Sequence, residues 1–428
     1  MTKCVTPSRT ALFVALTVVR SAYAEERENF VWVPERKGDT AIIRMLAFDC
    51  AGPPHFPSPL RSFRLTQDGD AGGASKATLT VLNDREGGFY ELQASNLSPG
   101  ERYKYTLNGY ISGSFRALPR EDASITFLAA GNTYDEKRHM EVAKAMGSVD
   151  ADVVIHTGNY ADDHYRWRGY FSIAEYFGSH REVLGAIGYR ELREPLFLDD
   201  YVRLFGPSGA DRSDADSLRR ALVRSERVGH VAFFFFGELD GDGFAKDLTR
   251  LSELMAASLK DHSVRWRIAV MPQIPLSEGL DAGTPNGLRL SELLAASKVD
   301  LVLSSQSLVY ERSVRRGIRT IMTGGVKPTV DVDAGSPALF SPFLIARTDR
   351  DQLTLEAKQV NGELIERCTI QKTRPGFVCD GENTGAAPPL NPIAPSGGPW
   401  KTNGMMGFAA SATLLGVALG LRKRLRRR

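Results

Sequence analysis

The hydrophobic pattern near the start of the chain alternates with a period of two. Short runs such as "TAIIRMLAF", "SFRLTQ", "KATLTVLN" and "GFYELQAS" have apolar side chains at alternating positions, and Gly, Pro, Asp and Asn separate the runs. The runs "RYKYTLNGY" and "GSFRAL" continue this pattern to Leu118. Such alternation predicts short strands that bury one face. Because no helical period interrupts them, residues 25–118 are predicted to form a β-sandwich.

A different pattern begins near Ser124. Continuous apolar runs, including "SITFLAAG", "ADVVIHTG", "EVLGAIG", "GHVAFFFFGEL", "RWRIAVMP" and "KVDLVLSS", are typical of strands buried on both faces. The segments "YDEKRHMEVAKAMG", "AKDLTRLSELMAASLK" and "LRLSELLAASK" have the period of amphipathic helices. Residues 119–379 are therefore predicted to form a layered α/β domain, which closes with the strand-rich "SPFLIARTD", "QLTLEAKQVNG" and "ELIERCTIQK". The predicted fold class is α/β plus all-β.

The N-terminus has the pattern of a secretory signal peptide. Lys3 and Arg9 precede a short apolar stretch over residues 11–19, and the sequence Ala-Tyr-Ala ends at Ala24. Small residues at this distance from an apolar stretch predict cleavage before Glu25, so residues 1–24 are assigned to the signal. A buried N-terminal helix is the alternative, which the shortness of the apolar run disfavours.

The C-terminus has the pattern of a membrane anchor. Residues 380–404 are rich in Pro, Gly and Asn and predict an extended linker. Residues 405–421, "MMGFAASATLLGVALGL", are uncharged and just long enough to span a bilayer, and the basic tail 422–428 follows. Basic residues stay on the cytoplasmic side. The sequence therefore predicts an exported protein of the cell envelope, anchored in the membrane with its folded domains extracytoplasmic. A buried core helix and a sorting tail that is cut and re-anchored are the alternatives.

Net charge and cysteine positions bear on the binding partners and on disulfide pairing. The formal net charge is +3, and much of the basic excess lies in the tail, so the sequence predicts no nucleic-acid partner. Removal of the signal peptide would discard Cys4. Of the remaining cysteines, Cys368 and Cys379 are close in sequence and are predicted to form a disulfide, which leaves Cys50 without an assigned partner. Three thiols as metal ligands are disfavoured by the absence of a C-x-x-C spacing.

The carboxyl ends of the buried strands, where such folds place their chemistry, carry a series of related motifs. They read "AAGNTYD", "HTGNYADD", "AIGYRE", "AVMPQIPLSEG" and "LSSQSLVYERS". In order and spacing they resemble the motifs of the purple acid phosphatase branch of the calcineurin-like metallophosphoesterases, over residues 31–372. The segment "LSPGERYKYTL" followed by "SGSFRALP" resembles the fibronectin-III-like sandwich that precedes the catalytic domain in that family. The resemblance implies such a sandwich followed by a layered phosphoesterase domain.

The family's chemistry uses two metal ions bridged by a carboxylate, which activate a water and neutralise the charge on the phosphoryl group. In this chain Asn132 stands in place of the first Asp ligand, and Asn159 stands in place of the bridging Asp. In the third motif Tyr189 replaces the Asn ligand and Arg190 replaces the proton-donating His. Gln273 replaces the His before the Pro, Gln306 and Leu308 replace the last two His residues, and Asp162 replaces the Tyr of the second motif. Loss of both carboxylates removes the charge that holds the cations. The resemblance therefore implies a degenerate site without the binuclear metal centre and without another cofactor.

The replacements keep this region polar. Asp to Asn and His to Gln preserve approximate size and hydrogen-bonding capacity. Arg190, with Gln273 and Gln306, is a candidate cradle for a phosphate or for a carboxylate of a partner protein. The plainer and favoured alternative is that Arg190 pairs with a nearby carboxylate. The carboxylates close to it in sequence are Asp162, Asp163 and Glu194.

A relocated metal site would have to use other residues of the sequence. They are His156, Asp162, Asp163 and His164 in one segment, and Glu238, Asp240 and Asp242 in another. A histidine at the end of a buried strand is more often a hydrogen-bonded core residue, and "DGDGF" lacks the spacing of a calcium loop. The relocated site is therefore disfavoured.

Three hypotheses about function follow. The leading one is a catalytically inactive, purple acid phosphatase-like pseudoenzyme that serves as a binding or structural module at the cell envelope. The second is a divergent phosphoesterase or other hydrolase that uses a relocated or non-standard site. The third is an adhesion protein in which the β-sandwich makes the contact. The loss of the metal ligands favours a protein that is not an enzyme.

Overall fold

The computed structural model describes most of the chain between residues 27 and 380. The described ranges are 27–49, 62–68, 77–85, 89–107, 111–131, 137–160, 167–178, 180–188, 191–192, 195–207, 214–237, 243–273, 284–305, 310–323 and 342–380. All of them belong to one compact unit that ends at Asp380. The predicted signal peptide, the membrane helix, the basic tail and Cys50 lie outside these ranges, as does the linker beyond Asp380. Within the described residues, no helix is long and apolar enough to cross a membrane.

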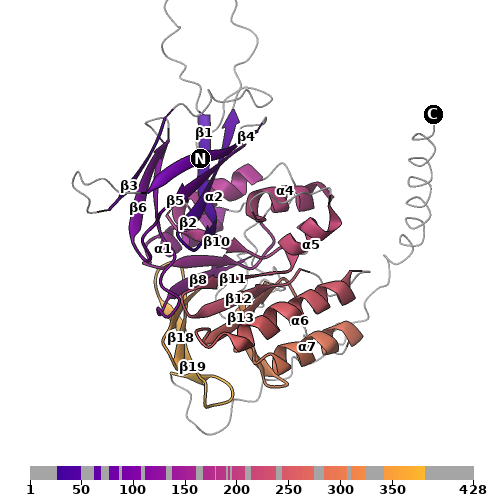
Figure 1. Cartoon of the computed structure of the whole chain (residues 1–428). Coiled ribbons are helices and arrows are strands. Elements are labelled where there is room, and N and C mark those ends of the chain that lie inside the picture. Colours follow the sequence, from indigo (N-terminus) through magenta and orange to yellow (C-terminus); the bar gives the residue numbers. More distant parts are fainter. Residues whose placement is uncertain are drawn as a thin grey trace, which may run out of the picture. The chain divides into compact units, whose positions relative to one another are not determined.

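Two stacked sheets form the centre of this unit (Figure 1). The first sheet has the order β20-β19-β18-β17-β8-β9-β10-β1-β2-β5-β4. Its central strands β8 (Thr126–Ala130), β9 (Val153–His156) and β10 (Glu182–Gly185) are parallel. Beside β8 run the antiparallel strands β17 (Phe343–Thr348), β18 (Gln352–Lys358), β19 (Leu364–Gln371) and β20 (Val378–Cys379).

The second sheet has six strands. Their order is β11-β12-β13-β14-β16-β15. The strands β12 (Val231–Phe235), β13 (Trp266–Met271), β14 (Leu301–Ser304) and β16 (Ile318–Thr323) are parallel, and β11 (Arg224–Val228) and β15 (Tyr310–Arg315) are antiparallel edge strands. All parallel strands of this sheet thus end at the same edge.

The core between the two sheets explains the continuous apolar runs. Phe127 and Ala129 of β8 point into this core, where the ring of Phe127 meets that of Phe233 edge-on at 5.3 Å between centroids. Leu128 and Ala130 point the other way, into a core shared with helices. A strand covered on both faces has no polar side, so it reads as an unbroken hydrophobic run.

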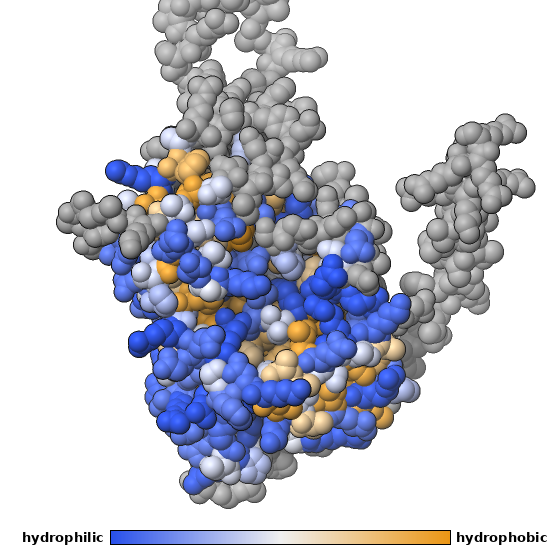
Figure 2. All heavy atoms as spheres, in the orientation of Figure 1, coloured by the Kyte–Doolittle hydropathy of each residue, from blue (hydrophilic) through white to orange (hydrophobic). Residues whose placement is uncertain are grey.

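Helices cover the two outer faces, giving four layers. The helices α1 (Lys137–Gly147), α2 (Trp167–Gly178) and α4 (Pro195–Phe205) pack against the first sheet. The helices α6 (Phe244–Lys260) and α7 (Pro285–Ala296) pack against the second, and α5 (Ala215–Leu222) precedes β11. On the face seen in Figure 2, hydrophilic residues cover most of the surface, with a smaller hydrophobic area over α6 and α7.

The N-terminal strands surround a core of their own. The strands β1 (Arg27–Lys37), β2 (Thr40–Asp49), β5 (Phe89–Ser95) and β4 (Thr78–Arg85) form one end of the first sheet. The strands β3 (Phe63–Gln67), β6 (Arg102–Leu107) and β7 (Ile111–Arg116) form a three-stranded sheet. Both sheets contribute to one core, to which Ile43, Leu92, Tyr105 and Phe115 belong.

A buried ion pair joins these strands to the α/β layers. Val33 of β1 pairs with Glu182 of β10 in the parallel sense. One Nη of Arg36 lies 2.8 Å from a carboxylate oxygen of Glu182, and their side chains are only 1% and 3% exposed. The Arg36 guanidinium also donates to the carbonyls of Arg116 at 2.6 Å and Asp152 at 3.0 Å. One side chain therefore ties together four segments that are far apart in sequence.

The structure also contains elements that the hydrophobic pattern did not predict. Among them are α2, α4, α5, β1, β11, β15 and β16. The motif "LSSQSLVYERS" follows the end of β14 and then enters β15, because Tyr310 to Arg315 pair with β16. This edge strand is only partly buried and carries charges at both alternating positions, so it has no apolar face that a sequence pattern can detect.

Candidate functional site

The carboxyl ends of several parallel strands meet at one corner. A Cβ added to Gly131, after β8, would lie 2.0 Å from Oγ1 of Thr157 and 2.8 Å from Cβ of Ser305. A Cβ on Gly158, after β9, would lie 2.7 Å from Cα of Gly188. Glycine is needed at both positions because a side chain there would overlap with these neighbouring loops of the same chain. The name "strand-end corner" is used below for Gly131, Thr157–Tyr160, Gly188, Glu191, Ser305 and Thr323.

Neutral hydroxyl groups connect the two sheets in the strand-end corner. The hydroxyl oxygens of Thr157 and Thr323 lie 3.1 Å apart, and Oγ of Ser305 donates to the carbonyl of Thr157 at 2.7 Å. All three residues are buried. Their hydrogen bonds to each other and to backbone carbonyls satisfy this part of the corner without an ion. None of these residues was a predicted site residue, although Thr157 and Ser305 lie at the ends of predicted buried strands.

Glu191 braces the loops of the corner. Its side chain is fully buried, and one carboxylate oxygen accepts hydrogen bonds from the backbone N–H of Gly188 at 2.7 Å and of Asn159 at 3.1 Å. The other accepts from the N–H of Tyr160 at 2.9 Å. Burial raises the pKa of Glu191 to about 6, although these three donors favour the ionised form. Both oxygens are therefore already used by the backbone.

The structure places two of the predicted site residues at strand ends. Asn159 follows β9, is 6% exposed and has a φ of +60°, a left-handed conformation that asparagine tolerates better than most residues. Gln273 follows β13 and is half-buried. Their side chains are neutral amides, which compensate poorly for the charge of a pair of divalent cations. The donors described at this corner therefore do not fit a binuclear metal centre.

The remaining predicted positions lie outside the described residues. They are Asn132, Asp162, Tyr189, Arg190, Gln306 and Leu308. Their described neighbours Gly131, Gly188, Glu191 and Ser305 all belong to the strand-end corner. The anion cradle of Arg190, Gln273 and Gln306 and the pairing of Arg190 with a carboxylate stay predictions.

His156 belongs to the core. It is 1% exposed, its Nδ1 accepts a hydrogen bond from the N–H of Gly158 at 3.2 Å, and its ring stacks on Tyr160 at 4.0 Å between centroids. The interpretation of His156 as a hydrogen-bonded core residue is confirmed. The other members of the disfavoured relocated site, Asp162, Asp163, His164, Glu238, Asp240 and Asp242, lie outside the described ranges.

A buried arginine stabilises the turn behind the corner. Arg224 of β11 donates to the carbonyl of Gly185 at 2.7 Å and to the hydroxyl of Tyr201 at 3.1 Å. Its guanidinium also lies over the ring of Phe235, 4.3 Å from the centroid. Tyr201 donates in turn to the same carbonyl at 2.7 Å. These contacts hold the end of β10, from which the loop to Gly188 departs.

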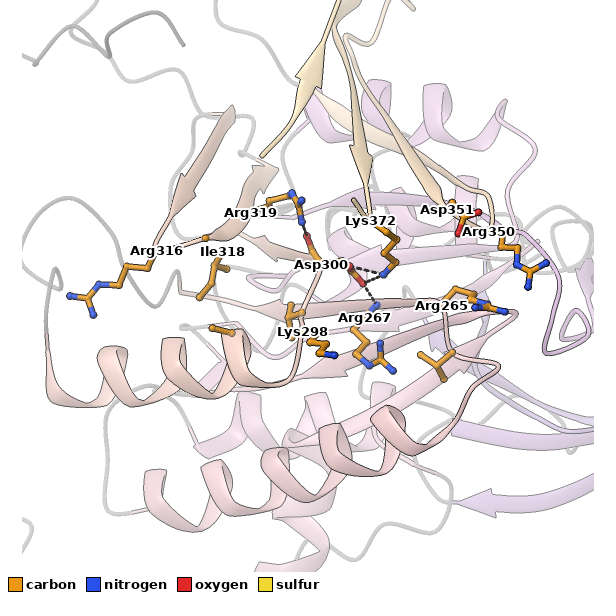
Figure 3. Close-up of a pocket in the computed structure, with 14 residues that line it drawn as sticks. Arg265, Arg267, Lys298, Asp300, Arg316, Ile318, Arg319, Arg350, Asp351 and Lys372 are labelled. Carbon is orange, nitrogen blue, oxygen red and sulfur yellow. Dashed lines mark hydrogen bonds and ion pairs between the residues drawn. The ribbon is translucent and has the colours of Figure 1, made fainter. Parts of the chain in front are cut away.

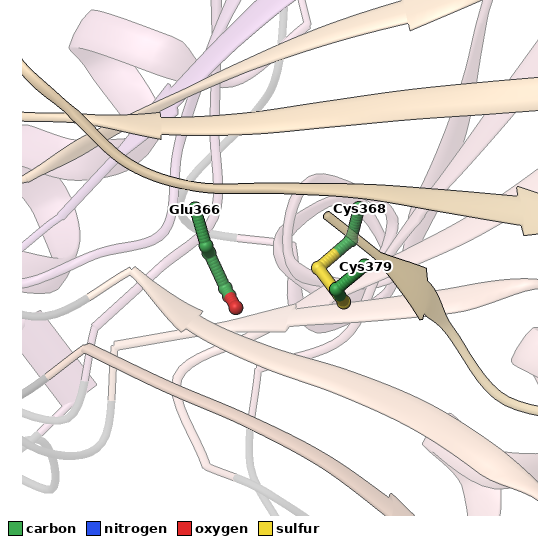
Figure 4. Close-up of side chains that lie close together, drawn as sticks. All are labelled: Glu366, Cys368 and Cys379. Atoms are coloured by element: carbon green, nitrogen blue, oxygen red, sulfur yellow. A yellow bond between two sulfur atoms is a disulfide. The ribbon is translucent and has the colours of Figure 1, made fainter. Parts of the chain in front are cut away.

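The predicted pair Cys368 and Cys379 is joined by a disulfide in the structure, between β19 and β20 (Figure 4). With Glu366 these cysteines form a cluster of residue types that bind metals. Sulfurs bonded to each other are not thiolate ligands. The Glu366 carboxylate also accepts from the hydroxyl of Tyr310 at 2.5 Å and from Arg312 at 3.2 Å. This cluster is therefore a structural crosslink beside an ion pair.

Comparisons with known proteins identify the fold. No protein-family model matches the sequence, and a search of curated proteins finds no match. The structure is similar to that of purple acid phosphatase PPD1 from yellow lupin seeds, with a TM-score of 0.57 and 14% identity, over 80% of this chain and 74% of that one. It is also similar to the structure of PhoD, with a TM-score of 0.56 and 11% identity, over 83% and 92%. The chain has a metallophosphoesterase fold, as its motifs predicted.

Proposed function

We propose that this protein is a catalytically inactive member of the metallophosphoesterase fold that acts as a binding or structural module. The observation that carries this proposal is the neutral amide of Asn159 at the end of β9. Asn159 stands after β9, where the resemblance puts the bridging carboxylate, and its backbone is held by Glu191. Both oxygens of Glu191 are occupied by backbone N–H groups. Glu191 stands where the family motif also has a Glu, so the difference from active relatives is the neutral amide of Asn159.

Charge supports the same proposal. Two divalent cations bring four positive charges into a buried site, and they are retained only if anionic ligands compensate for them. The aligned positions carry Asn132 and Asn159 in place of two carboxylates, and Arg190 adds a positive charge. Leu308 offers no donor atom. No phosphoryl-transfer step is therefore assigned to this site.

Export and membrane tethering are part of the proposal. The disulfide of Cys368 and Cys379 is typical of proteins in oxidising compartments, in agreement with the predicted signal peptide. The strands β1 to β7 around one core support the fibronectin-III-like assignment of the N-terminal part. The predicted helix over residues 405–421 and the basic tail would supply the anchor.

The inactive assignment predicts a metal-free protein. Elemental analysis of the purified full chain is expected to find far less than one equivalent of iron, zinc or manganese, even after incubation with excess metal. Hydrolysis of a generic aryl phosphate is expected to stay at the buffer rate. The proposal would be wrong if the protein held about two metal ions and turned over at roughly one per second or faster. The variant Asn132→Asp/Asn159→Asp tests whether the missing carboxylates alone explain the result, and we expect it to remain inactive.

If residues 405–421 anchor the protein, a truncated form without them should leave the membrane fraction of the cell. Deletion of residues 405–428 is expected to move the protein from the membrane fraction to the soluble fraction, because the apolar segment is removed. Detergent extraction and immunoblotting of both forms would measure this. Retention of the truncated form in membranes would contradict the tether, and deletion of only the tail 422–428 serves as the control for the loss of positive charge.

A further inference from the structure

A pocket rich in cations lies at the opposite edge of the second sheet from the strand-end corner. It has a volume of about 580 Å³ and lies at the amino ends of β13, β14 and β16, next to the turn between β17 and β18 (Figure 3). The name "basic pocket" is used for this site. The seven cationic residues that line it are Arg265, Arg267, Lys298, Arg316, Arg319, Arg350 and Lys372, and its two carboxylates are Asp300 and Asp351.

The inner cations of the basic pocket are held in fixed positions. Nζ of Lys372 lies 2.6 Å from both carboxylate oxygens of Asp300 and 4.1 Å from the centroid of the Trp266 ring. Arg267 donates to the carbonyl of Ser258 at 2.7 Å. Arg319 donates to the carbonyl of Gly376 at 2.7 Å. These contacts preorganise the floor, which lowers the entropy that a ligand must lose to bind there.

The carboxylate of Asp300 does not cancel the positive charge of this floor. Burial and the neighbouring Arg267 and Arg319 lower the pKa of Lys372, despite the opposite effect of Asp300. The Asp300 side chain is 10% exposed, and its two oxygens face Lys372 and the backbone N–H of Arg267. A ligand that brings further negative charge would therefore be attracted to this group of cations.

Four outer cations have no anionic partner within the described part of the chain. They are Arg265, Lys298, Arg316 and Arg350, and they come from four separate segments. Lys298 follows the carboxyl end of α7, where a cation is favoured by the helix dipole. Arg350 stands between Asp349 and Asp351 in sequence, whereas Arg265 and Arg316 have no such local reason. Arg316 lies in the two-residue turn between β15 and β16, where its φ of +49° and that of Gly317, +78°, are typical of a tight hairpin.

We propose that the basic pocket binds a small ligand that carries several phosphate groups. Arginine forks donate paired hydrogen bonds to phosphate oxygens, and a ligand with several phosphates matches an excess of five cations over carboxylates. The volume is in the range of about 300–1,000 Å³ that small-molecule sites occupy. A concave site fits a compact polyphosphate or polyol phosphate better than a flat membrane surface. This inference does not depend on the proposed function, because the pocket shares no residue with the strand-end corner.

Calorimetric titration of the full chain with inorganic tripolyphosphate and with inositol hexakisphosphate would test this proposal. At about 0.15 M salt we expect saturable binding of one ligand per chain, and much weaker binding of sulfate. The variant Arg316→Ala/Arg350→Ala is expected to bind about a hundredfold more weakly, since loss of each charge-assisted contact costs about tenfold. Both side chains are exposed, so the variant is expected to fold, which circular dichroism would verify.

The matched control removes two cations from another basic groove. That groove, of about 350 Å³, contains Arg220 and Lys246 between α5 and α6. The variant Arg220→Ala/Lys246→Ala has the same net charge as the test variant and should bind as the parent does. The proposal would be overturned if both variants bound the ligands equally weakly, or if the parent protein showed no saturable binding of either ligand.

A vesicle assay separates a soluble ligand from a lipid headgroup. Vesicles that contain phosphatidylinositol bisphosphate are compared with phosphatidylserine vesicles of equal total charge. Preference for the former, lost in Arg316→Ala/Arg350→Ala, would identify a phosphorylated headgroup as the ligand. Binding of tripolyphosphate without vesicle binding would identify a soluble ligand, and both results support the pocket. Equal binding to the two kinds of vesicle, with no saturable binding of the soluble phosphates, would reduce the pocket to a nonspecific charged surface.

Discussion

Replacement of Glu191 by alanine is expected to lower the free energy of unfolding by about 3–5 kcal/mol. The substitution leaves the backbone N–H groups of Gly188, Asn159 and Tyr160 without their acceptor in a buried corner. Each unsatisfied buried donor costs about 1–3 kcal/mol, and relaxation of the loops recovers part of the sum. Denaturant titration of the purified protein, followed by tryptophan fluorescence, would measure the loss.

The effect of Glu191→Ala is also expected to depend on pH. The pKa of Glu191 rises from its ordinary value of 4.5 to about 6 in the folded protein, which therefore binds this proton more tightly than the unfolded chain does. The corresponding stability is complete below pH 4.5 and is lost as the pH rises through 6. The difference in the free energy of unfolding between the parent and Glu191→Ala should thus shrink by about 2 kcal/mol as the pH rises from below 4.5 to above 6.

Two further variants distinguish the brace from a general effect of substitution. Glu191→Gln keeps the shape but turns one acceptor oxygen into a donor, so we expect an intermediate loss of about 1–3 kcal/mol and no titration near pH 6. Glu292→Ala, at an exposed position of α7, should change stability by less than about 0.5 kcal/mol. A Glu191→Ala protein as stable as Glu292→Ala would show that the brace contributes nothing.

Replacement of Arg36 by alanine is expected to cost about 3–5 kcal/mol. The variant leaves the carboxylate of Glu182 buried without its cation, and two backbone carbonyls lose a donor. The loss should fall on the junction between β1 and β10, so unfolding of the N-terminal strands ahead of the α/β layers is expected. Hydrogen exchange with mass spectrometry would detect this as faster exchange in β1, β2 and β7 than in β8 and β9.

The pH dependence of Arg36→Ala follows from Glu182. Burial raises the pKa of Glu182, and Arg36 opposes this shift, so removal of the arginine raises the pKa further. Below pH 4.5, the ordinary pKa, the carboxyl group of Glu182 is protonated in the folded and in the unfolded protein, so folding buries no charge. The loss of stability in Arg36→Ala should therefore be largest above neutral pH and shrink toward pH 4.5.

An apolar replacement of the whole pair is the control for this junction. Arg36→Leu/Glu182→Leu removes both charges while filling similar volume, and such exchanges are often neutral or stabilising. We expect it to recover most of the stability lost in Arg36→Ala. If the double variant were as unstable as the single one, the carbonyl hydrogen bonds of Arg36 rather than the ion pair would hold the junction.

The amino-acid sequence by itself predicted the layers and, through the family resemblance, the replacement of the metal ligands. Buried strands such as β8, β9 and β13 are visible as apolar runs, because both their faces are covered. The replacement of two carboxylates by Asn132 and Asn159 is likewise a prediction from local motifs, because each position directly follows its own strand. Local pattern and local motif were sufficient for these features.

Only the tertiary structure decided which side chains meet. Glu191 accepts from residues 31 and 32 positions earlier, and Arg36 reaches a carboxylate 146 positions away. The outer cations of the basic pocket come from four segments between Arg265 and Arg350, none of which has a basic run long enough to suggest an anion site. Side chains of this kind gain their roles when strands end at a common edge and loops pack, and these contacts leave no periodic trace in the sequence.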